Sequence, residues 1–384
     1  MKDLLLDLFD NSAKPQVNSQ PHNSNPQDSK QCLPLLAMLH AGISYQPLAE
    51  RLHQGMQPSA LLNSPSCLPS SVAELVRALS SKSHSAWQQA ERSLALMQER
   101  NIQLLLPNDP CWPQQLSPLP QAPGWLFVQG QVRVLAKPQL ALVGSRHASA
   151  AALRRAAQLA EQLAHHGWVV TSGMALGIDA KAHLGAMVQG HTLAVLGSGL
   201  ANLYPKRHLA LAKQIAEQGA LISEYPPTEA ALNWHFPARN RIISGLAQGV
   251  VVVEADLRSG SLITARWALE QGREVMAMPG SPDNPNARGC HQLIKQGAAL
   301  VNDAEDVLAL MGTQLASPLQ QEQQPGSALK GLAKLIWQEL DEVPISLDAL
   351  CLRLDRPLAQ LLPVILQLQL DGYIAQQGQW LSRA

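Results

Sequence analysis

The spacing of apolar residues changes along the chain, and the change separates two kinds of domain. From Cys32 to about residue 100, apolar side chains recur three or four positions apart, in segments divided by short Gly, Pro and Ser breaks. This spacing is typical of amphipathic helices. We therefore expect a small helical domain, followed by a Pro-rich join, over residues 32–125. A short hairpin is expected near the end of the join, from Trp125 to Val134.

From about residue 126 the pattern becomes one of short, nearly continuous apolar runs that alternate with amphipathic helical segments. Such alternation is typical of a mostly parallel sheet with helices on both faces. We therefore expect a doubly wound α/β domain over residues 126–312. Its strands are expected at Leu140–Val143, Trp168–Thr171, Thr192–Leu196, Ala220–Ser223, Val250–Glu254 and Glu274–Met278.

Two polar stretches flank these domains. Residues 1–31 are mostly Asn, Gln, Ser and Pro after a short apolar start, and we expect a disordered tail. Residues 313–328 are rich in Gln, Pro and Ser and are expected to form a linker. The chain after this linker is a further domain.

Residues 329–384 show the order of a winged helix, with three helical segments followed by two short strands. The segment in the position of a recognition helix, Pro357–Leu370, contains no Lys or Arg. A helix that reads DNA lies between two rows of phosphates, so this composition is unfavourable for that role. We favour contact with a protein over contact with duplex DNA.

Composition and charge narrow the class of protein. The chain has 384 residues, of which 46% are hydrophobic and 15% charged, and its formal net charge is zero. No global field therefore draws it to nucleic acid or membrane, and anion binding has to come from local clusters. The five cysteines are scattered and form no CxxC, which suits a reducing compartment and argues against a disulfide framework or zinc site.

The same reading predicts a cytoplasmic protein without a metal or cofactor. The apolar run at the N-terminus is short and interrupted by aspartates, unlike a signal peptide. No apolar stretch approaches the roughly 20 residues needed to span a bilayer.

Candidate phosphate-binding residues follow several of the expected strands. Because the carboxyl ends of parallel strands meet at one edge of a sheet, we expect these side chains to form one rim. Glycines and hydroxyls at the start of a helix, together with arginine donors, bind phosphate. The candidates are Gly144, Ser145, Arg146, Lys206, Phe236, Arg239, Asn240, Arg241, Ser259 and Ser261.

Some of these residues have ordinary structural alternatives. Lys206 is equally consistent with a solvated charge, and Phe236 with a core residue that anchors a helix start, although an exposed Phe beside Arg would stack a base. The turn Leu39–Ile43 resembles a helix-hairpin-helix of a SAM-like domain, but we favour a plain connection between helices. Asp179 and His183 lie four apart, and we favour a capping aspartate that satisfies a histidine over an acid–base pair.

The catalytic signatures of nucleotide enzymes are missing. No GxGxxG and no GxxxxGK[ST] occurs, so neither a dinucleotide fingerprint nor a triphosphatase loop is supported. Glu254 and Asp256 could be taken for a hydrolytic carboxylate pair, but no metal-ligand spacing accompanies them. We expect binding without catalysis.

Taken in order, the loop motifs resemble the DNA-processing protein A family (DprA, also called Smf). The resemblance covers residues 120–310 closely, and the flanking parts in order only. The motifs are Val143-Gly144-Ser145-Arg146, Ser172 to His183, Leu196-Gly197-Ser198-Gly199 with Tyr204-Pro205, Ser223-Glu224-Tyr225-Pro226, Phe236 to Arg241, Ser259-Gly260-Ser261 and Pro279-Gly280.

The resemblance implies an extended Rossmann-like fold that binds single-stranded DNA. It also implies loading of the RecA recombinase onto that DNA during natural transformation, from a homodimer. The family's phosphate pocket would be formed by the candidate residues named above. Met174-Ala175-Leu176 stands where Leu-Ala-Arg is commoner, so a basic contact from that loop is in doubt.

Two further hypotheses stay open. A related Rossmann-like group cleaves nucleoside monophosphates at the glycosidic bond, with a Pro-Gly-Gly-x-Gly-Thr loop and a catalytic Glu; here that loop reads Arg258-Ser259-Gly260-Ser261. The segment Leu5–Phe9 resembles peptides that dock on the replication sliding clamp, although their usual leading Gln is absent and an amphipathic chain end is the simpler interpretation.

Overall fold

A computed structural model describes residues 26–312, 331–340, 345–354, 356–370, 374–377 and 380–383. The pattern of contacts divides the chain into two compact units, residues 1–307 and 308–384. Both the helical segment and the α/β sheet belong to the first unit. The expected linker at 313–328 and the segment Leu5–Phe9 lie outside the described residues.

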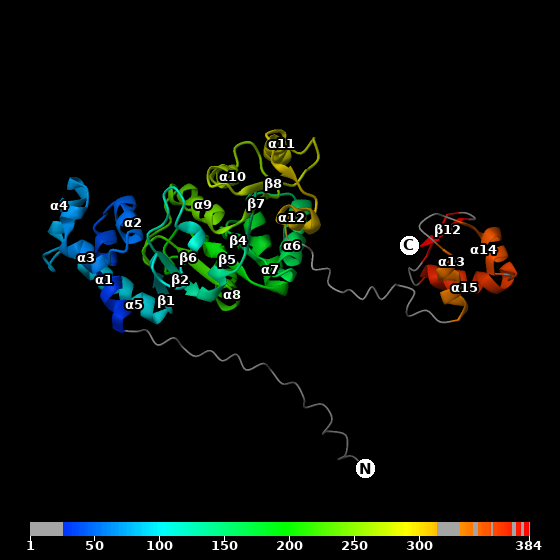
Figure 1. Ribbon diagram of the computed structural model, residues 1–384, viewed down its shortest axis with the longest axis horizontal. Coiled ribbons are helices and arrows are strands. Elements are labelled where there is room, and N and C mark those ends of the chain that lie inside the picture. Colours follow the sequence, from blue (N-terminus) through cyan, green and yellow to red (C-terminus); the bar gives the residue numbers. More distant parts are fainter. Residues whose placement is uncertain are drawn as a thin grey trace, which may run out of the picture. The chain divides into compact units, whose positions relative to one another are not determined.

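The first unit is built on a mixed sheet, shown in Figure 1, whose described strands number nine in the order β1-β2-β6-β5-β4-β3-β7-β8-β9. Seven strands, β6-β5-β4-β3-β7-β8-β9, run parallel to one another. The remaining two are antiparallel: β2 pairs with β6 on one side and with β1 on the other. Their bounds are β1 Ile102–Leu105, β2 Leu126–Gly130, β3 Gln139–Val143, β4 Val169–Ser172, β5 Thr192–Val195, β6 Ala220–Ser223, β7 Gly249–Val252, β8 Glu274–Ala277 and β9 Ala299–Leu300.

The order of the parallel strands reverses beside β3. The chain proceeds from β3 to β4, β5 and β6 on one side, and then returns to place β7 against the other side of β3, followed by β8 and β9. In an open α/β sheet, ligands bind outside the carboxyl ends of the strands at such a topological switch point. The expected doubly wound, Rossmann-like fold is therefore confirmed, and the switch point lies between β3 and β7.

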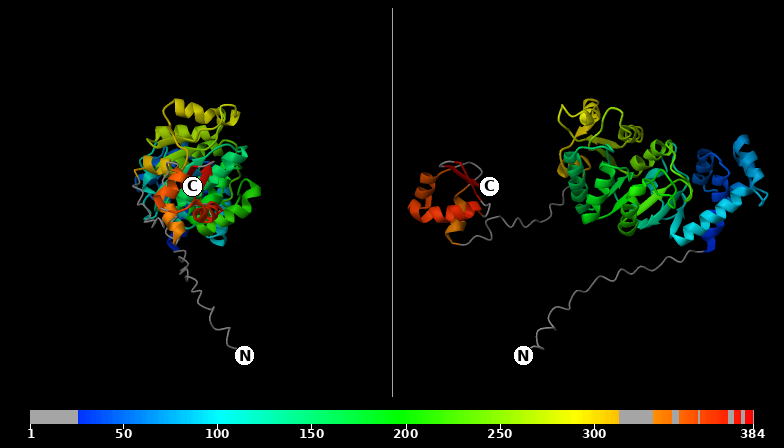
Figure 2. Two further views of the ribbon diagram at one scale, coloured as in Figure 1. Left: turned by 90° about the vertical axis from the view of Figure 1, so that its right-hand side faces the viewer. Right: turned by 180° about the vertical axis from the view of Figure 1, so that it is seen from behind.

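Helices cover both faces of the sheet, as Figures 1 and 2 show. On β5, Ala194 joins the apolar core that contains Ile215 of α8, whereas Leu193 joins the core that contains Ile242 of α9 and Ala265 of α10. Alternate strand residues thus face opposite helical layers. The helices that follow the strands are α6 Ala150–His165, α7 Ile178–Gln189, α8 Leu209–Gln218, α9 His235–Leu246, α10 Ser261–Glu270, α11 Arg288–Lys295 and α12 Ala304–Leu310.

The helical segment packs directly on the sheet. Trp125 and Phe127, at the β2 edge, are fully buried in one core with Leu35 and Leu36 of α1. No break in packing therefore separates this segment from the α/β part at residue 125. Its helices are α1 Pro26–His40, α2 Tyr45–His53, α3 Pro58–Asn63, α4 Ser70–Ala78 and α5 Ser85–Glu99.

Three expectations for this region need correction or support. The tail was expected to extend to residue 31, but α1 begins at Pro26, a residue suited to the first turn of a helix. The hairpin was expected at 125–134; instead β2 pairs with β1, and a 3-10 helix follows at Val132–Ala136. In the α1–α2 turn, Gly42 has a φ of +73°, and its N–H and that of Ile43 donate to carbonyls of α1, which supports the plain connection.

The second unit has the predicted winged-helix order. It contains an antiparallel sheet with its described strands in the order β10-β12-β11. Its core includes Ile336, Leu350, Leu361 and Leu381. The elements are α13 Leu332–Glu339, β10 Ile345–Ser346, α14 Leu347–Leu354, α15 Leu358–Leu370, β11 Ile374–Gln377 and β12 Trp380–Arg383.

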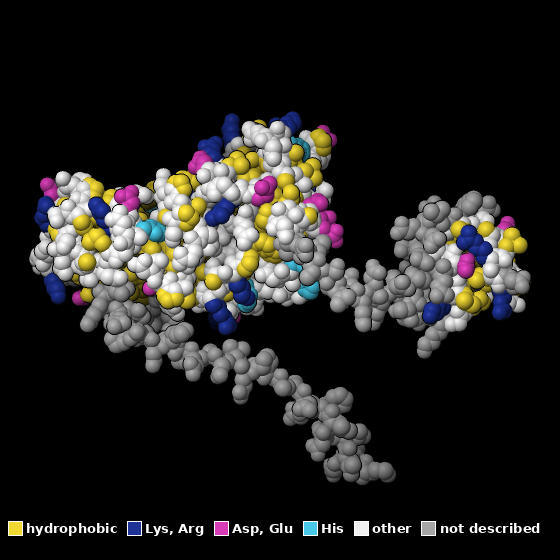
Figure 3. Space-filling model, viewed as in Figure 1, with side chains coloured by type: hydrophobic (Ala, Val, Ile, Leu, Met, Phe, Trp, Pro, Cys, Tyr) yellow, Lys and Arg dark blue, Asp and Glu magenta, His cyan; other side chains and the backbone are white. Residues whose placement is uncertain are grey.

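The surface carries no broad field of one sign on the side shown in Figure 3, where basic and acidic side chains are interspersed. This agrees with the zero formal net charge of the sequence. Within the described part of the chain, none of the helices combines the length and the apolarity needed to cross a membrane.

Candidate nucleic-acid interface

A cleft of about 570 Å³ opens at the carboxyl ends of β3 and β7, at the switch point of the sheet. We call it the switch-point cleft. Loops that follow each of the strands β3 to β8 contribute to it, together with the first turns of α9 and α10. Its lining includes Gly144, Ser145, Arg146, His147, Ala175, Asp179, Tyr204, Asn233, Phe236, Arg239, Asn240, Asp256, Arg258, Ser259, Gly260, Ser261 and Asn286.

The loop after β3 packs closely against the start of α7 and the residues that directly follow β7. A β-carbon on Gly144 would lie 2.6 Å from Cγ1 of Ile178 and 2.9 Å from the carbonyl oxygen of Glu254, so only glycine fits there. The backbone N–H of Ser145 donates to that same carbonyl at 2.7 Å. This fixed loop presents Arg146 as an exposed cation at the mouth of the cleft.

Glu254 has a structural role. One carboxylate oxygen accepts from the N–H of Ser149 at 2.8 Å, and the other accepts from the Ser149 hydroxyl at 2.7 Å and from Asn284 at 2.9 Å. The carboxylate therefore ties the start of α6 to the loop after β8. It does not line the cleft, so the pairing with Asp256 that the sequence raised does not form there.

Phe236 brings an aromatic face into the cleft. It lies over Gly197, where a β-carbon would come within 2.9 Å of the ring. The guanidinium carbon of Arg146 is 5.7 Å from its ring centroid, and the ring of Tyr204 is 5.6 Å away. A half-buried ring flanked by a cation suits a planar base that carries a phosphate.

The turn before α10 supplies hydroxyls at a helix N-terminus. The side-chain oxygens of Ser259 and Ser261 are 2.7 Å apart, and Asn240 donates to the carbonyl of Gly260 at 3.3 Å, which anchors the turn to α9. Arg258, directly before the turn, is exposed and lines the cleft. Hydroxyls and helix N–H groups beside an arginine form an anion site.

Arg239 lies at the bottom of the cleft and is only 5% exposed. Its Nη1 donates to the carbonyl of Gly173 at 2.8 Å and also to that of Val195, and its Nε donates to Asn240 at 3.0 Å. Burial lowers the pKa of Arg239 to about 10, so the side chain stays charged at neutral pH. Through Nη1 the side chain holds the ends of β4 and β5 together.

Arg241 does not share this face. Its Nη2 lies 2.7 Å from Oε1 of Glu224, and its Nε donates to the carbonyl of Gln121 at 2.9 Å. Residues two apart on a helix point about 200° apart, so Arg239 and Arg241 diverge. The expectation that both face one site is therefore not met for Arg241. Lys206 is exposed in the loop after β5, outside the cleft lining.

His183 and Asp179 are separately satisfied. Asp179 accepts from the N–H groups of Gly173 and Ala175 at 3.1 and 3.3 Å, and burial raises its pKa while the charge of Arg239 opposes that rise. Thr192, by contrast, is the partner of His183, at 2.7 Å from Nδ1. Asp179 is structural, but the expectation of a capping aspartate that satisfies the histidine was wrong: the N-cap of α7 is Gly177, Asp179 binds the preceding loop, and His183 binds Thr192.

Comparison with known proteins identifies the family. The family model described as DNA recombination-mediator protein A matches residues 103–312, and the model of the DprA winged helix domain matches residues 320–379. Protein Smf of Escherichia coli is 43% identical over 298 residues, which span 74% of this chain and 78% of that protein. The chain belongs to the DNA recombination-mediator protein A family. The resemblance inferred from the loop motifs is thereby confirmed.

Other members of the DNA recombination-mediator protein A family give a consistent picture. DNA processing protein DprA of Streptococcus pneumoniae is 46% identical over 202 residues, which span 52% of this chain and 71% of that protein. A crystal structure of S. pneumoniae DprA superposes with a TM-score of 0.60 at 35% identity and covers 72% of this chain and 96% of that one. The structure of the Helicobacter pylori protein, described by its single-stranded DNA binding mode, gives 0.51 at 26% identity and covers 55% of this chain and 97% of that one.

In this family member, the structure brings most of the predicted residues to one cleft. Several lining residues were not predicted. Arg258 directly precedes the Ser-Gly-Ser turn and was recognisable by that position. Tyr204, Asn233 and Asn286 come from separate loops, and only the folded sheet places them together.

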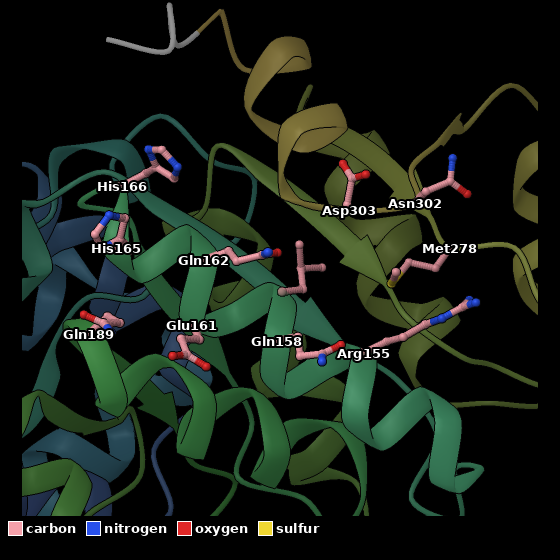
Figure 4. A pocket seen from close by; sticks show the side chains of 11 residues that line it. Arg155, Gln158, Glu161, Gln162, His165, His166, Gln189, Met278, Asn302 and Asp303 are labelled. Carbon is pink, nitrogen blue, oxygen red and sulfur yellow. The ribbon is translucent and has the colours of Figure 1, made fainter. Parts of the chain in front are cut away.

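A second hollow, of about 550 Å³, lies along α6 and is shown in Figure 4. It is lined by Arg155, Glu161 and the amide side chains of α6, with Asp303 on the opposite side. None of the predicted phosphate-binding residues belongs to it.

Proposed function

We propose that this protein binds single-stranded DNA through the switch-point cleft and helps to load the RecA recombinase onto it during natural transformation. The observation that carries the proposal is the combination, at one switch point, of two exposed cations, a helix-start hydroxyl pair and an aromatic face. Family membership supports it, as does the relative whose structure is described by its single-stranded DNA binding mode.

The chemistry of the cleft favours a polymer of unstacked bases. Arg146 and Arg258 are exposed and suit successive phosphates, because guanidinium groups bind phosphate with two parallel hydrogen bonds. The face of Phe236 stacks with any base, so recognition would tolerate all sequences. A duplex keeps its bases paired and stacked, and cannot offer one to this ring.

We further propose that the cleft binds without catalysis. The described lining contains two carboxylates, Asp179 and Asp256. Asp179 is buried and accepts hydrogen bonds from the loop after β4, so Asp256 is the more accessible of the two. Glu254, outside the lining, is held by Ser149 and Asn284. The alternative is glycosidic cleavage of nucleoside monophosphates. Incubation of the protein with each of them, followed by chromatography, tests this: free base would establish the enzyme.

Salt-dependent binding tests the main proposal. We would measure fluorescence anisotropy of a labelled single-stranded oligonucleotide with the wild type and with Arg146→Ala/Arg258→Ala. Loss of two phosphate contacts should reduce the slope of log affinity against log salt by about 1.4. Arg77→Ala/Arg92→Ala, which removes two exposed cations from α4 and α5, is the matched control. Equal affinity of the cleft variant and the wild type would refute the assignment.

The proposed partners require their own measurements. We propose a cytoplasmic homodimer that contacts RecA, and filament assembly by RecA on single-stranded DNA, with and without the protein, tests the loading activity. Light scattering of the purified protein tests the dimer. A labelled peptide of residues 1–14 tests the sliding clamp hypothesis for Leu5–Phe9. No acceleration of RecA filament assembly would remove the loading role while leaving DNA binding intact.

A further inference from the structure

Trp234 is unusual among the tryptophans of the first unit. It is 63% exposed, whereas Trp87, Trp112, Trp125 and Trp168 are buried and Trp267 is partly buried. Tryptophan is large and apolar and is highly buried on average, so an exposed indole has a marked cost in solvent. Tryptophan is enriched at binding interfaces, where a ligand or partner covers the ring.

The side chain is also held in place. Its ring centroid lies 4.1 Å from that of His235 and 6.3 Å from that of Tyr225, with interplanar angles of 76° and 81°. His235 and Tyr225 are buried and stack on each other at 3.8 Å. A rigid stack therefore supports the exposed indole, which loses little conformational entropy when a ligand covers it.

The position of Trp234 relates it to the switch-point cleft. It is the N-cap residue of α9, directly after Asn233 and two residues before Phe236, both of which line the cleft. The residue follows β6, and Tyr204, which is 51% exposed and contacts Phe236, follows the neighbouring β5. Exposed aromatic rings thus continue from the cleft along the strand-end edge of the sheet, towards β6.

We propose that Trp234 is a second base-stacking platform, which extends the bound single strand from the switch-point cleft along the sheet edge towards β6. The proposal rests on the function proposed above. Lys206, two residues after Tyr204 in the loop after β5, is exposed and is suited to a phosphate of the extension. A nucleic-acid strand fits this edge better than a protein partner, because the loops after β5 and β6 carry two exposed aromatic rings, Tyr204 and Trp234, together with the cation Lys206.

The effect of the platform depends on oligonucleotide length. Stacking on an aromatic ring stabilises a bound base by about 1–3 kcal/mol, or roughly 5- to 150-fold in affinity. For an exposed ring we expect the lower end, about five- to tenfold. The affinity for a short oligonucleotide that fills only the cleft should not depend on Trp234, whereas the affinity for a longer one should.

The experiment compares Trp234→Ala and Trp234→Phe on oligonucleotides of about 4 and about 16 nucleotides, the two ends of the range of single-strand site sizes. Val188→Ala, which truncates a side chain that is 62% exposed on α7, is the control for loss of exposed apolar surface. We expect Trp234→Ala to weaken only the longer oligonucleotide, and Trp234→Phe to retain most of the affinity. Quenching of intrinsic fluorescence by the long oligonucleotide should be smaller in Trp234→Phe than in the wild type.

Each other result has a definite meaning. If Trp234→Ala binds the long oligonucleotide like the wild type while Arg146→Ala/Arg258→Ala does not, the platform is wrong and the cleft stands. If Trp234→Ala weakens both lengths equally, the residue acts on the start of α9, and the platform is again wrong. If neither Trp234→Ala nor Arg146→Ala/Arg258→Ala loses affinity, the proposed function is wrong, and the platform is wrong with it. Thermal melting of each variant checks that it is folded.

Discussion

The guanidinium of Arg239 occupies the space beside Gly173 that a side chain would otherwise fill. A β-carbon on Gly173 would lie 2.5 Å from Nη2 of Arg239, and Nη1 donates to the Gly173 carbonyl at 2.8 Å. The same nitrogen also donates to the carbonyl of Val195. The arginine therefore joins the ends of β4 and β5, and its first role is to hold together the edge on which the cleft is built.

Arg239→Ala should destabilise the protein before it alters a DNA contact. The change leaves buried carbonyls and Asp179 without their positive partner, and breaking such a buried arrangement costs about 3–5 kcal/mol. We expect a clear fall in the melting temperature of the first unit by calorimetry. Arg146→Ala, at an exposed position in the same cleft, should change stability by less than about 0.5 kcal/mol. Equal melting of the two variants would contradict this structural role.

Arg241→Ala should lower the free energy of unfolding and leave the affinity for DNA nearly unchanged. Its ion pair with Glu224 spans 2.7 Å, with side chains 12% and 6% exposed, and it lies outside the cleft lining. Removal of one partner from a largely buried pair leaves the other unsatisfied, at a cost of about 1–3 kcal/mol. A double-mutant cycle with Arg241→Ala and Glu224→Gln, read by thermal unfolding, should therefore show strong coupling. A tenfold loss of DNA affinity in folded Arg241→Ala would instead show that this residue belongs to the DNA interface.

These two arginines show how far the sequence predicts the site. Apolar runs located the strands, and small or basic residues after each run located the cleft, because parallel strands end at one edge. The direction of each side chain on α9 was not predictable in the same way. Arg239 and Arg241 diverge because they are two residues apart on a helix, but which of them faces the cleft depends on how α9 packs on the sheet, and Arg241 meets Glu224 only in the folded chain. The hairpin error has a similar cause, since β1 and β2 pair across a long connection.

His183 should make the protein less stable in mild acid. It is fully buried: Nδ1 donates to the hydroxyl of Thr192, which itself donates to the carbonyl of Val170, and Nε2 accepts from Met174. Burial lowers its pKa to about 3, with smaller contributions from His208 and Arg239. The neutral ring is therefore required in the folded state, whereas the unfolded chain takes up a proton below about pH 6.5.

The direction in which stability changes with pH follows from this difference between the pKa of His183 in the folded and in the unfolded state. Above pH 6.5 the histidine is neutral in both states and contributes no pH dependence, and below it the unfolded state binds the extra proton. Stability should fall by about 1.4 kcal/mol per pH unit from this residue as the pH decreases towards 3. His183→Gln, although less stable at pH 7, should show a shallower decline by chemical unfolding between pH 7 and 5. An unchanged slope in that variant would show that His183 is not the group responsible.

The winged helix should contribute little to binding of duplex DNA. Along α15, Leu358, Leu362 and Leu366 are 40%, 50% and 59% exposed at four-residue spacing, so an apolar stripe stands where a recognition helix would need cations. The basic residues that directly precede α15 in the sequence are Arg353 and Arg356, in α14 and in the segment after it. Arg353→Ala/Arg356→Ala should therefore change the affinity for a 20-base-pair duplex by less than about twofold at moderate salt. If either arginine did contact a phosphate, its loss would weaken binding and lower the slope of log affinity against log salt by roughly 0.9. Anisotropy titrations at several salt concentrations check both quantities, and a tenfold loss confined to duplex DNA would make this unit a DNA-binding module.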